Sequence, residues 1–265
     1  MVEPSSETGN DGVLLALQDL SLSFGGVVAL RSVSFDVRRG EIVSLIGPNG
    51  AGKSSLLNLI SGVYRPSGGC LRFEQTVYRT MMPEQAARLG IGRTFQNIAL
   101  FRGMSVAENV LVGRHIHMNA GFFACGLPFG RAPREERHHC IAVDKILELL
   151  NLTSIRSDPV ENLPYGLQKR VELARALVAA PKLLLLDEPM AGMSVDDKHA
   201  MVRLIIQSAA ELNLTVLLIE HDVGIVMDIS DRIVVLDYGR KLAEGSPADI
   251  RSNPDVINAY LGKVA

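Results

Sequence analysis

The chain has 265 residues, 47% of them hydrophobic, which is enough to bury a sizeable core as one large domain or two small ones. Its 27 Lys and Arg residues nearly balance its 29 Asp and Glu residues, so the composition gives no support for nucleic acid as a partner. The three cysteines are far apart without a Cys-x-x-Cys pair, and no apolar run approaches the ~20 residues that span a bilayer, so we expect a reduced, cytosolic chain.

The first third of the chain predicts strands around one glycine-rich turn. Residues 1–12 are polar and acidic, unlike a signal peptide, and we expect a disordered tail there, followed by one domain over residues 13–265. The expected strands are Leu14–Phe24, Val33–Val37, Glu41–Gly47 and Cys70–Tyr78. The expected helices are Lys53–Ser61, stopped by Gly62, and Pro83–Leu89, with proline at its start and Gly90 after it.

The middle of the chain changes to helical signals. Ser105 and Glu108 have the spacing of a capping box before an apolar run. A loop broken by glycine and proline follows at Gly121–Pro133, and Pro133–Asn151 has the apolar spacing of a helix. We therefore expect a mostly helical insertion over about residues 97–178.

The remainder of the chain returns to alternating strands and helices. In order, we expect a strand at Lys182–Pro189, a helix at Asp196–Leu212, a strand at Leu214–Glu220, a helix at Val223–Ser230 and a hairpin-like pair at Arg232–Gly245. Strands that alternate with helices predict an α/β fold whose largely parallel sheet is covered on both faces.

The segment "GPNGAGKSS" matches the pattern Gly-x-x-x-x-Gly-Lys-Ser between a predicted strand and a predicted helix. Glycines let backbone N–H groups turn toward phosphate oxygens, and a helix N-terminus adds partial positive charge. Lys53 can reach β- and γ-phosphates, and Ser54 can offer its hydroxyl to Mg²⁺. A plain glycine-rich turn is the alternative. The residues expected to hold the nucleotide here are Gly47, Pro48, Asn49, Gly50, Ala51, Gly52, Lys53, Ser54 and Ser55.

The segment "LLLLDEP" supplies the acidic partner that such a loop needs. Its apolar strand places Asp187 at the C-terminal end, where a carboxylate can hold Mg²⁺ through water. Glu188 follows directly and can orient or activate an attacking water. Two solvated acids at a strand end would look the same in isolation, and the phosphate loop favours the functional interpretation.

Several other residues carry no signal alone. His221 after a strand, Gln96 in "RTFQN" and Phe24 in "LSFGG" would each be ordinary core or surface residues. The histidines of "RHIHMN" and "RHHC" have metal-ligand spacing, but no second cluster pairs with either, so we expect solvated histidines.

Taken together, these motifs resemble the nucleotide-binding subunit of an ABC transporter, from about Leu14 to the C-terminus. The resemblance implies a P-loop ATPase core with a mostly parallel sheet, an N-terminal antiparallel β subdomain and a helical insertion subdomain. It implies that Phe24 stacks on adenine and that Gln96 contacts Mg²⁺ and senses the membrane subunit. It also implies that His221 holds the γ-phosphate and the attacking water, beside the catalytic Glu188 and Lys53.

The stretch "LPYGLQ" falls where this family carries Leu-Ser-Gly-Gly-Gln. In the family that segment crosses a dimer interface and caps the γ-phosphate held by the other subunit, which assigns Tyr165, Gly166 and Gln168 to the nucleotide. Pro164 stands in the place of the serine and has neither a hydroxyl nor a backbone N–H to donate. Capping must then fall on the N–H groups around Gly166 and on the helix dipole.

Several segments differ from the common motifs of the family, and these differences indicate a subfamily. "LxYG", "RTFQNIALF", "AGM" after the acidic strand and the ending "NPDVINAYLG" resemble the longer ATPase subunit of branched-chain amino acid importers. That resemblance implies ATP and Mg²⁺ as cofactors and a peripheral position on the cytoplasmic face of the inner membrane. The implied partners are a second ATPase subunit (the same chain or a shorter paralogue), the permease subunits and, indirectly, a solute-binding protein, with no nucleic acid.

Two other functions are compatible with an ABC-type ATPase. A soluble ATPase acting on nucleic acid or assemblies usually needs two fused nucleotide domains or a coiled-coil or basic insertion, and this chain has one phosphate loop and neither insertion. A regulator that binds ATP without turnover predicts loss of Glu188 or Lys53, and both are present.

Overall fold

The computed structural model describes residues 12–94, 98–115 and 132–261. They form two compact units. The first contains the described residues up to Arg93, Lys182–Pro189 and those from Ile206 onward; the second contains those of Thr94–Pro181 and Met190–Ile205. The expected tail before Gly12, Gln96 and nearly all of the loop Gly121–Pro133 lie outside the described residues. The boundaries 13–265 and 97–178 stay predictions.

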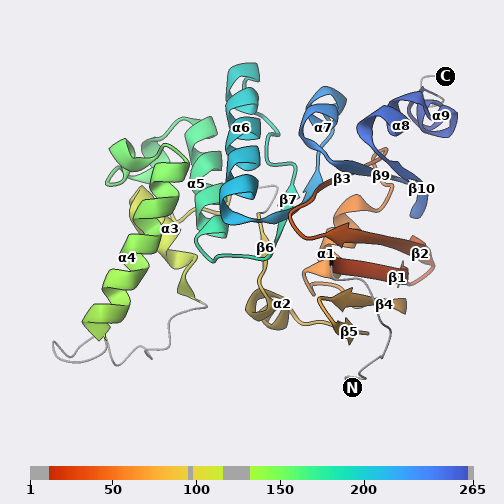
Figure 1. The fold of residues 1–265 in the computed structure, drawn as a ribbon, viewed down its shortest axis with the longest axis horizontal. Helices are drawn as coiled ribbons and strands as arrows, with labels where there is room; N and C mark the ends of the chain where they lie inside the picture. The colour runs from red at the N-terminus through yellow and green to blue at the C-terminus, as the bar shows by residue number, and fades with distance from the viewer. Residues whose placement is uncertain (1–11, 95–97, 116–131, 262–265) are drawn as a thin grey trace. The chain divides into compact units, whose positions relative to one another are not determined.

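An antiparallel sheet of four strands lies in the first unit, in the order β2-β1-β4-β5 (Figure 1). The strands are β1 (Val13–Phe24), β2 (Val27–Arg38), β4 (Gly68–Phe73) and β5 (Thr76–Tyr78). This confirms the antiparallel subdomain.

The single strand expected over Cys70–Tyr78 is wrong, because the chain turns at Glu74. That residue adopts a left-handed φ of 55°, and its backbone N–H donates to the carbonyl of Leu14 at 2.7 Å. Arg39 and Lys182 donate to its carboxylate at 2.8 and 2.9 Å and hold the pKa of Glu74 below its usual value. Neither glycine nor proline marks this turn, so the sequence pattern did not reveal it.

The second sheet of the same unit has six strands in the order β10-β9-β3-β8-β7-β6. Its members are β3 (Ile42–Ile46), β6 (Ile91–Arg93), β7 (Leu183–Asp187), β8 (Thr215–Ile219), β9 (Arg232–Asp237) and β10 (Arg240–Gly245). All neighbours pair in parallel except β10, which is antiparallel to β9. Every residue of β3, β7 and β8 is buried, as expected of a parallel sheet covered on both faces.

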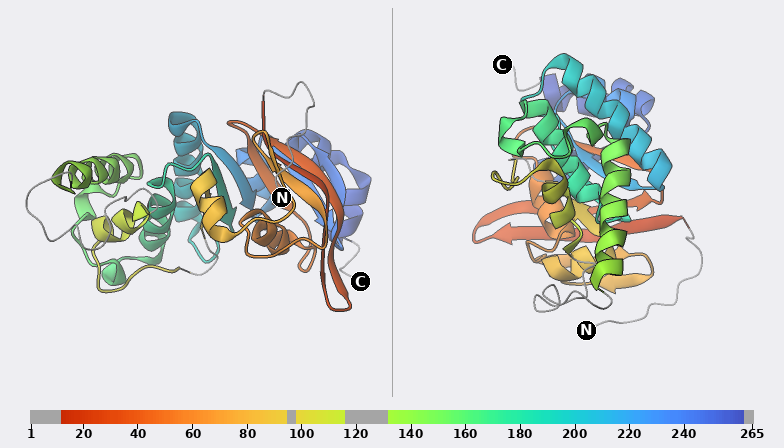
Figure 2. Two further views of the ribbon diagram at one scale, coloured as in Figure 1. Left: turned by 90° about the horizontal axis from the view of Figure 1, so that it is seen from below. Right: turned by 90° about the vertical axis from the view of Figure 1, so that its left-hand side faces the viewer.

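Side-chain alternation along the six-stranded sheet separates two apolar cores. Leu45, Leu185 and Ile219 belong to a large core shared with residues of the antiparallel sheet and of α1 (Lys53–Ile60). Figure 2 shows two further views of the ribbon in which these elements can be followed by colour. Ile46 and Val235 face the opposite core. The unit also contains α2 (Pro83–Leu89), the end of α6 (Val195–Leu212), α7 (Val223–Ile229), α8 (Pro247–Ser252) and α9 (Pro254–Leu261).

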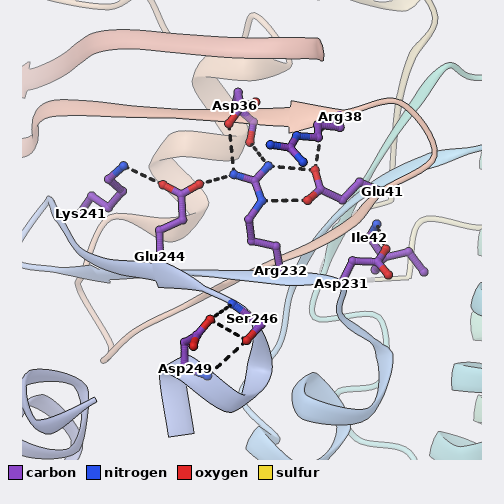
Figure 3. Close-up of polar contacts among 10 residues, drawn as sticks. All are labelled: Asp36, Arg38, Glu41, Ile42, Asp231, Arg232, Lys241, Glu244, Ser246 and Asp249. Atoms are coloured by element: carbon purple, nitrogen blue, oxygen red, sulfur yellow. Dashed lines mark hydrogen bonds and ion pairs between the residues drawn. The ribbon is translucent and has the colours of Figure 1, made fainter. Parts of the chain in front are cut away.

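A cluster of charged side chains around Arg232 connects β2, β9 and β10 by ion pairs (Figure 3). The guanidinium donates to Glu41 twice at 2.8 Å, to Asp36 at 3.1 Å and to Glu244. Lys241 also donates to Glu244, at 2.7 Å. The hydrogen bond with Glu41 raises the pKa of Arg232 further, against the opposing effect of burial. This arginine is therefore a structural brace of the sheet.

The second unit is helical. It holds α3 (Val106–Val112), α4 (Ala132–Leu149), the short 3-10 turns Thr153–Ile155 and Val160–Asn162, α5 (Tyr165–Leu177) and the start of α6 (Val195–Leu212). The predicted capping box is confirmed, since the Ser105 backbone N–H donates to Glu108 at 2.7 Å. A Cβ on Gly113 would meet the Arg175 carbonyl at 2.1 Å, so glycine permits the close approach of α3 and α5. Within the described ranges, no helix is both long and apolar enough to cross a membrane.

Candidate functional site

Three neighbouring parallel strands of the first unit end at one edge of the six-stranded sheet. The glycine-rich loop follows β3, His221 follows β8, and β7 ends in Asp187 and Glu188. Asp187 is paired in register with Ile219, two residues before His221. The carboxyl edge of such a sheet is the usual position of a ligand site, and the predicted residues of these three motifs meet there.

The loop between β3 and α1 requires glycine at two positions. Gly47 has a φ of 148°, and a Cβ there would lie 2.1 Å from the Leu236 carbonyl oxygen. Gly52 has a φ of 100°, and a Cβ there would lie 2.8 Å from the Ala29 carbonyl oxygen. The backbone conformation and the close contacts at these two positions allow only glycine, which explains the glycines of the motif.

Lys53 begins α1 and folds back over the loop. Its ammonium donates to the carbonyls of Gly47 at 2.7 Å and Pro48 at 3.1 Å, and the residue is only 6% exposed. Ser54 is exposed at the same helix start, as are Asn49 and Gly50 in the loop. A buried cation and exposed donors at one helix N-terminus suit a polyanionic ligand.

Asp187 is buried at the end of β7, and its two oxygens differ. Arg93 on β6 donates to Oδ2 at 3.0 Å. Oδ1 is buried and has no hydrogen-bond partner within the described part of the chain. An unsatisfied carboxylate oxygen and the hydroxyl of Ser54 are the oxygen donors that Mg²⁺ prefers, so the residues fit this metal.

Glu188 and His221 are brought together although 33 residues separate them. Glu188 Oε1 lies 2.6 Å from His221 Nε2. The backbone N–H of Glu188 donates to the Ile219 carbonyl at 3.0 Å, and Glu188 adopts a left-handed φ of 50°, unusual for a residue with a side chain. Strain of this kind, fixed by a neighbouring strand, is often found at functional positions. The pair is in direct hydrogen-bond contact and can share a proton between a carboxylate and an imidazole.

Phe24 lies at the surface end of β1. Its side chain is 47% exposed, so the alternative of a core residue is wrong. The ring packs edge-on against Tyr64, with centroids 5.1 Å apart and planes at 77°. The exposed ring can therefore offer a flat apolar surface to a ligand while Tyr64 fixes its orientation.

In the second unit, the stretch that resembles the family signature forms the start of α5. Pro164 is the N-cap and supplies no side-chain hydrogen bond, and its carbonyl accepts from the N–H groups of Leu167 and Gln168. The Gln168 side chain donates to the Leu163 carbonyl at 2.8 Å, so it folds back on its own chain. Tyr165 is exposed, with its hydroxyl donating to the Ala191 carbonyl at 3.2 Å.

Gly166 in the first turn of α5 is covered by a carboxylate of the same unit. A Cβ on Gly166 would lie 2.8 Å from Asp197 Cγ and 3.0 Å from both carboxylate oxygens. Ser194 donates to Asp197 at 2.7 Å and holds it in place. Any side chain at position 166 must therefore displace Asp197.

The histidine-rich segments form no metal site in the part that the structure describes, where no group of three or more His, Cys, Asp and Glu could hold an ion. The expectation of solvated histidines is wrong for His139, which is 5% exposed. Its Nδ1 accepts from Arg114 Nε at 3.2 Å, and Arg114 also donates to the Val178 carbonyl. His139 thus serves helix packing, because α4 turns it inward; His117 lies outside the described residues.

Sequence reasoning missed four residues near these features. Arg93 belongs to the quoted "RTFQN", where it had no assigned role, and a charged residue at the end of a short β-like run was the available signal. Tyr64 and Asp197 gave no signal, because their partners are distant in sequence. Tyr260 lies in α9, which was not predicted; burial raises the pKa of its hydroxyl, and a hydrogen bond with the backbone of Gly47 opposes that rise.

Comparisons with known proteins identify the family of the chain. Residues 30–191 match the ABC transporter family, and residues 240–265 match the family described as branched-chain amino acid ATP-binding cassette transporter. The chain is 44% identical to the high-affinity branched-chain amino acid transport ATP-binding protein LivG of Salmonella typhimurium, covering 94% of this chain and 98% of that protein. It is 42% identical to the corresponding protein BraF of Pseudomonas aeruginosa, with the same coverage.

A solved structure shares the fold. The ADP conformation of an ATP-binding cassette of an ABC transporter superposes with a TM-score of 0.81 at 30% identity, covering 94% of this chain and 99% of that one.

Proposed function

The chain belongs to the ABC transporter family of ATP-hydrolysing subunits, and from this premise we propose that it powers import of branched-chain amino acids or related small solutes. Support for this substrate class comes from the names of its relatives in Salmonella and Pseudomonas and from the C-terminal match over residues 240–265. The subunit itself need not touch the solute.

Nucleotide binding rests on the loop after β3 and on Phe24. The adenine stacks on the exposed ring of Phe24, and phosphate oxygens accept from the backbone N–H groups of residues 49–54. Lys53 exchanges its present bonds to the Gly47 and Pro48 carbonyls for bonds to β- and γ-phosphate oxygens. The exchange is favourable because a hydrogen bond between two charged groups is stronger than one to a neutral carbonyl.

When bound, Mg²⁺ would supply positive charge that offsets the negative charge of the phosphates. The hydroxyl of Ser54 and, through water, the free oxygen of Asp187 would hold it, with Gln96 as a third donor. These three residues supply oxygens only, in keeping with the preference of this metal.

The close approach of Glu188 and His221 is the observation that carries the catalytic proposal. Glu188 takes the proton of the attacking water, and its oxygen already lies 2.6 Å from His221 Nε2. His221 orients that carboxylate and, with ATP bound, holds the γ-phosphate. Positioning and charge neutralisation supply most of the catalysis in this type of phosphoryl transfer.

A second ATPase subunit completes the site. The start of α5, with Tyr165, Gly166 and Gln168, faces the γ-phosphate on that second subunit, which is either the same chain or a shorter paralogue. A helix N-terminus suits a phosphate because its free N–H groups and dipole both favour negative charge. The remaining partners are permease subunits and, indirectly, a solute-binding protein, so the subunit works at the cytoplasmic face of the membrane.

Reconstitution tests the proposal. The chain is purified with its membrane subunits, placed in vesicles, and assayed for phosphate release with and without the solute-binding protein loaded with leucine, isoleucine or valine. We expect stimulation by the loaded binding protein. Stimulation by nucleic acid instead would favour a soluble ATPase, and nucleotide binding without any phosphate release would favour a regulator.

A further inference from the structure

Arg93 is largely buried and contacts both the helix after the phosphate loop and the acidic strand. It ends β6, and the backbone of Arg93 is in register with Leu185 of β7, two residues before Asp187. One terminal nitrogen, Nη2, donates to Asp187 Oδ2 at 3.0 Å. The other, Nη1, donates to Asn58 Oδ1 at 2.6 Å and to Ser61 Oγ at 2.9 Å.

These contacts connect two of the motifs of the nucleotide site. Asn58 and Ser61 lie at the C-terminal end of α1, the helix that starts with Lys53 and Ser54. Asp187 is the buried acid of β7. The guanidinium therefore spans from the helix that follows the phosphate loop to the carboxylate proposed to hold the metal through water.

The side chains of Arg93 and Asp187 are only 11% and 6% exposed, so the geometry of the pair is strongly constrained. Because Arg93 engages one oxygen of Asp187, the other is left buried and unpartnered within the described part of the chain. A carboxylate whose two oxygens are differentiated in this way cannot rotate freely.

We propose that Arg93 is a positioning residue for the metal site: it fixes Asp187 by Oδ2 and thereby presents Oδ1 to the water shell of Mg²⁺. This inference rests on the proposed function, because it takes Asp187 as the metal-holding acid. Arg93 does not touch the substrate. It acts through Asp187 and keeps α1 and β7 at a fixed separation.

The chemistry explains why an arginine stands here. A guanidinium is planar, always charged, and carries donors on separate nitrogens, so one group can serve Asn58 and Asp187 in fixed directions at once. A lysine supplies the same charge through a single nitrogen on a flexible stem. It would compensate the carboxylate without orienting it.

A purely structural ion pair is the competing explanation, because breaking a buried pair destabilises a protein whatever its role. Arg232 provides the matched control. It is a largely buried arginine of the same sheet, bonded to Asp36, Glu41 and Glu244, and it belongs to none of the nucleotide motifs. Arg232→Met should lower the melting temperature without changing the dependence of nucleotide binding on Mg²⁺.

The experiment measures the Mg²⁺ concentration that half-saturates binding of a fluorescent ATP analogue, in a Glu188→Gln background that prevents turnover. In Arg93→Met we expect this concentration to rise about tenfold, the loss of one hydrogen bond between charged groups. Arg93→Lys and Asn58→Ala should each raise it about threefold, because they keep a charge near Asp187 but release its orientation. Arg232→Met should leave it within twofold.

The outcomes separate the two proposals. If Asp187→Asn does not change the Mg²⁺ dependence, the proposed metal role of Asp187 is wrong. If Asp187→Asn raises the half-saturating concentration but the Arg93 and Asn58 variants stay within twofold of the parent, Arg93 is only a structural brace. A lower concentration in Arg93→Met would mean that the guanidinium competes with the metal, which also overturns the inference. If Arg93→Met does not fold, Arg93→Lys and Asn58→Ala decide.

Discussion

The edge of the six-stranded sheet and the start of α5 are built on opposite principles. At the sheet edge, the chain supplies both partners of each interaction: Lys53 bonds to loop carbonyls, Arg93 to Asp187, and Glu188 approaches His221. The start of α5 has a proline N-cap with no side-chain hydrogen bond. The first region is thus held by contacts within the chain, whereas the second has no side-chain cap at its helix start. Under the proposed function, one chain carries a nearly complete nucleotide site and the α5 start that completes the site on a second subunit.

The largest expected effect concerns the sheet edge. Glu188→Gln keeps the size of the side chain but removes its ability to accept a proton, so phosphate release should fall by about 10²-fold or more, with ATP binding retained. The assay is phosphate release with the membrane subunits present. Full turnover by the variant would remove Glu188 from the mechanism.

Lys53→Ala should weaken nucleotide binding itself. The phosphates lose their main cationic partner, worth about 1.5–3 kcal/mol, or roughly a 10- to 100-fold increase in the dissociation constant. A titration with ATP and Mg²⁺ measures it, and Lys182→Ala, which removes a surface ion pair with Glu74, serves as the control. Equal affinity in Lys53→Ala and the parent would show that another residue binds the phosphates.

Phe24→Ala tests the edge of the same region. The loss of stacking and burial should weaken nucleotide binding by about 1–2 kcal/mol, which is measured as a larger dissociation constant. Phe24→Tyr should keep the dissociation constant of the parent, because it keeps an aromatic ring. Because stacking tolerates different bases, GTP should show a similar loss. An unchanged constant in Phe24→Ala would leave the ring with only its packing against Tyr64.

Pro164→Ser probes the second region and has the smallest expected effect. A serine at this N-cap gains a hydroxyl donor, so the ATP-bound dimer should be stabilised by about 1 kcal/mol, roughly fivefold in its dissociation constant. Light scattering of the Glu188→Gln form with ATP and Mg²⁺ measures this constant. A weaker dimer would argue that the proline itself sets the direction of the chain into α5.

The sequence predicted the sheet edge well because its residues obey local rules. An apolar run ending in acid, or in a glycine-rich loop, marks a buried parallel strand and its ligand-facing end, and these elements appear where expected. The turn at Glu74 was not predicted, because it is stabilised by ion pairs with Arg39 and Lys182, which are distant in the sequence. The burial of His139 was not predicted for the same reason, since its partner Arg114 is 25 residues away.

In the candidate site, the motifs could be found in the sequence from their spacing. The residues that contact and orient the motif residues could not be found in this way. Arg93, Tyr64 and Asp197 act through contacts that the fold alone creates. Asp197 also gives a structural reason for glycine at position 166, because the carboxylate of Asp197 leaves no room there for a side chain.

We propose that the start of α5 completes a nucleotide site on a second subunit. The most direct test is retention of ATP after rapid gel filtration of the complete transporter carrying Glu188→Gln, compared with the same complex carrying Gly166→Asp as well. Gly166→Asp sets a carboxylate against the phosphate and into Asp197, so we expect loss of retained ATP. Gly103→Asp, where an added Cβ meets nothing within 4 Å, should retain it. Equal retention in the Gly166→Asp complex would show that the start of α5 does not bind the nucleotide of a second subunit, and that "LPYGLQ" is only a loop before a helix.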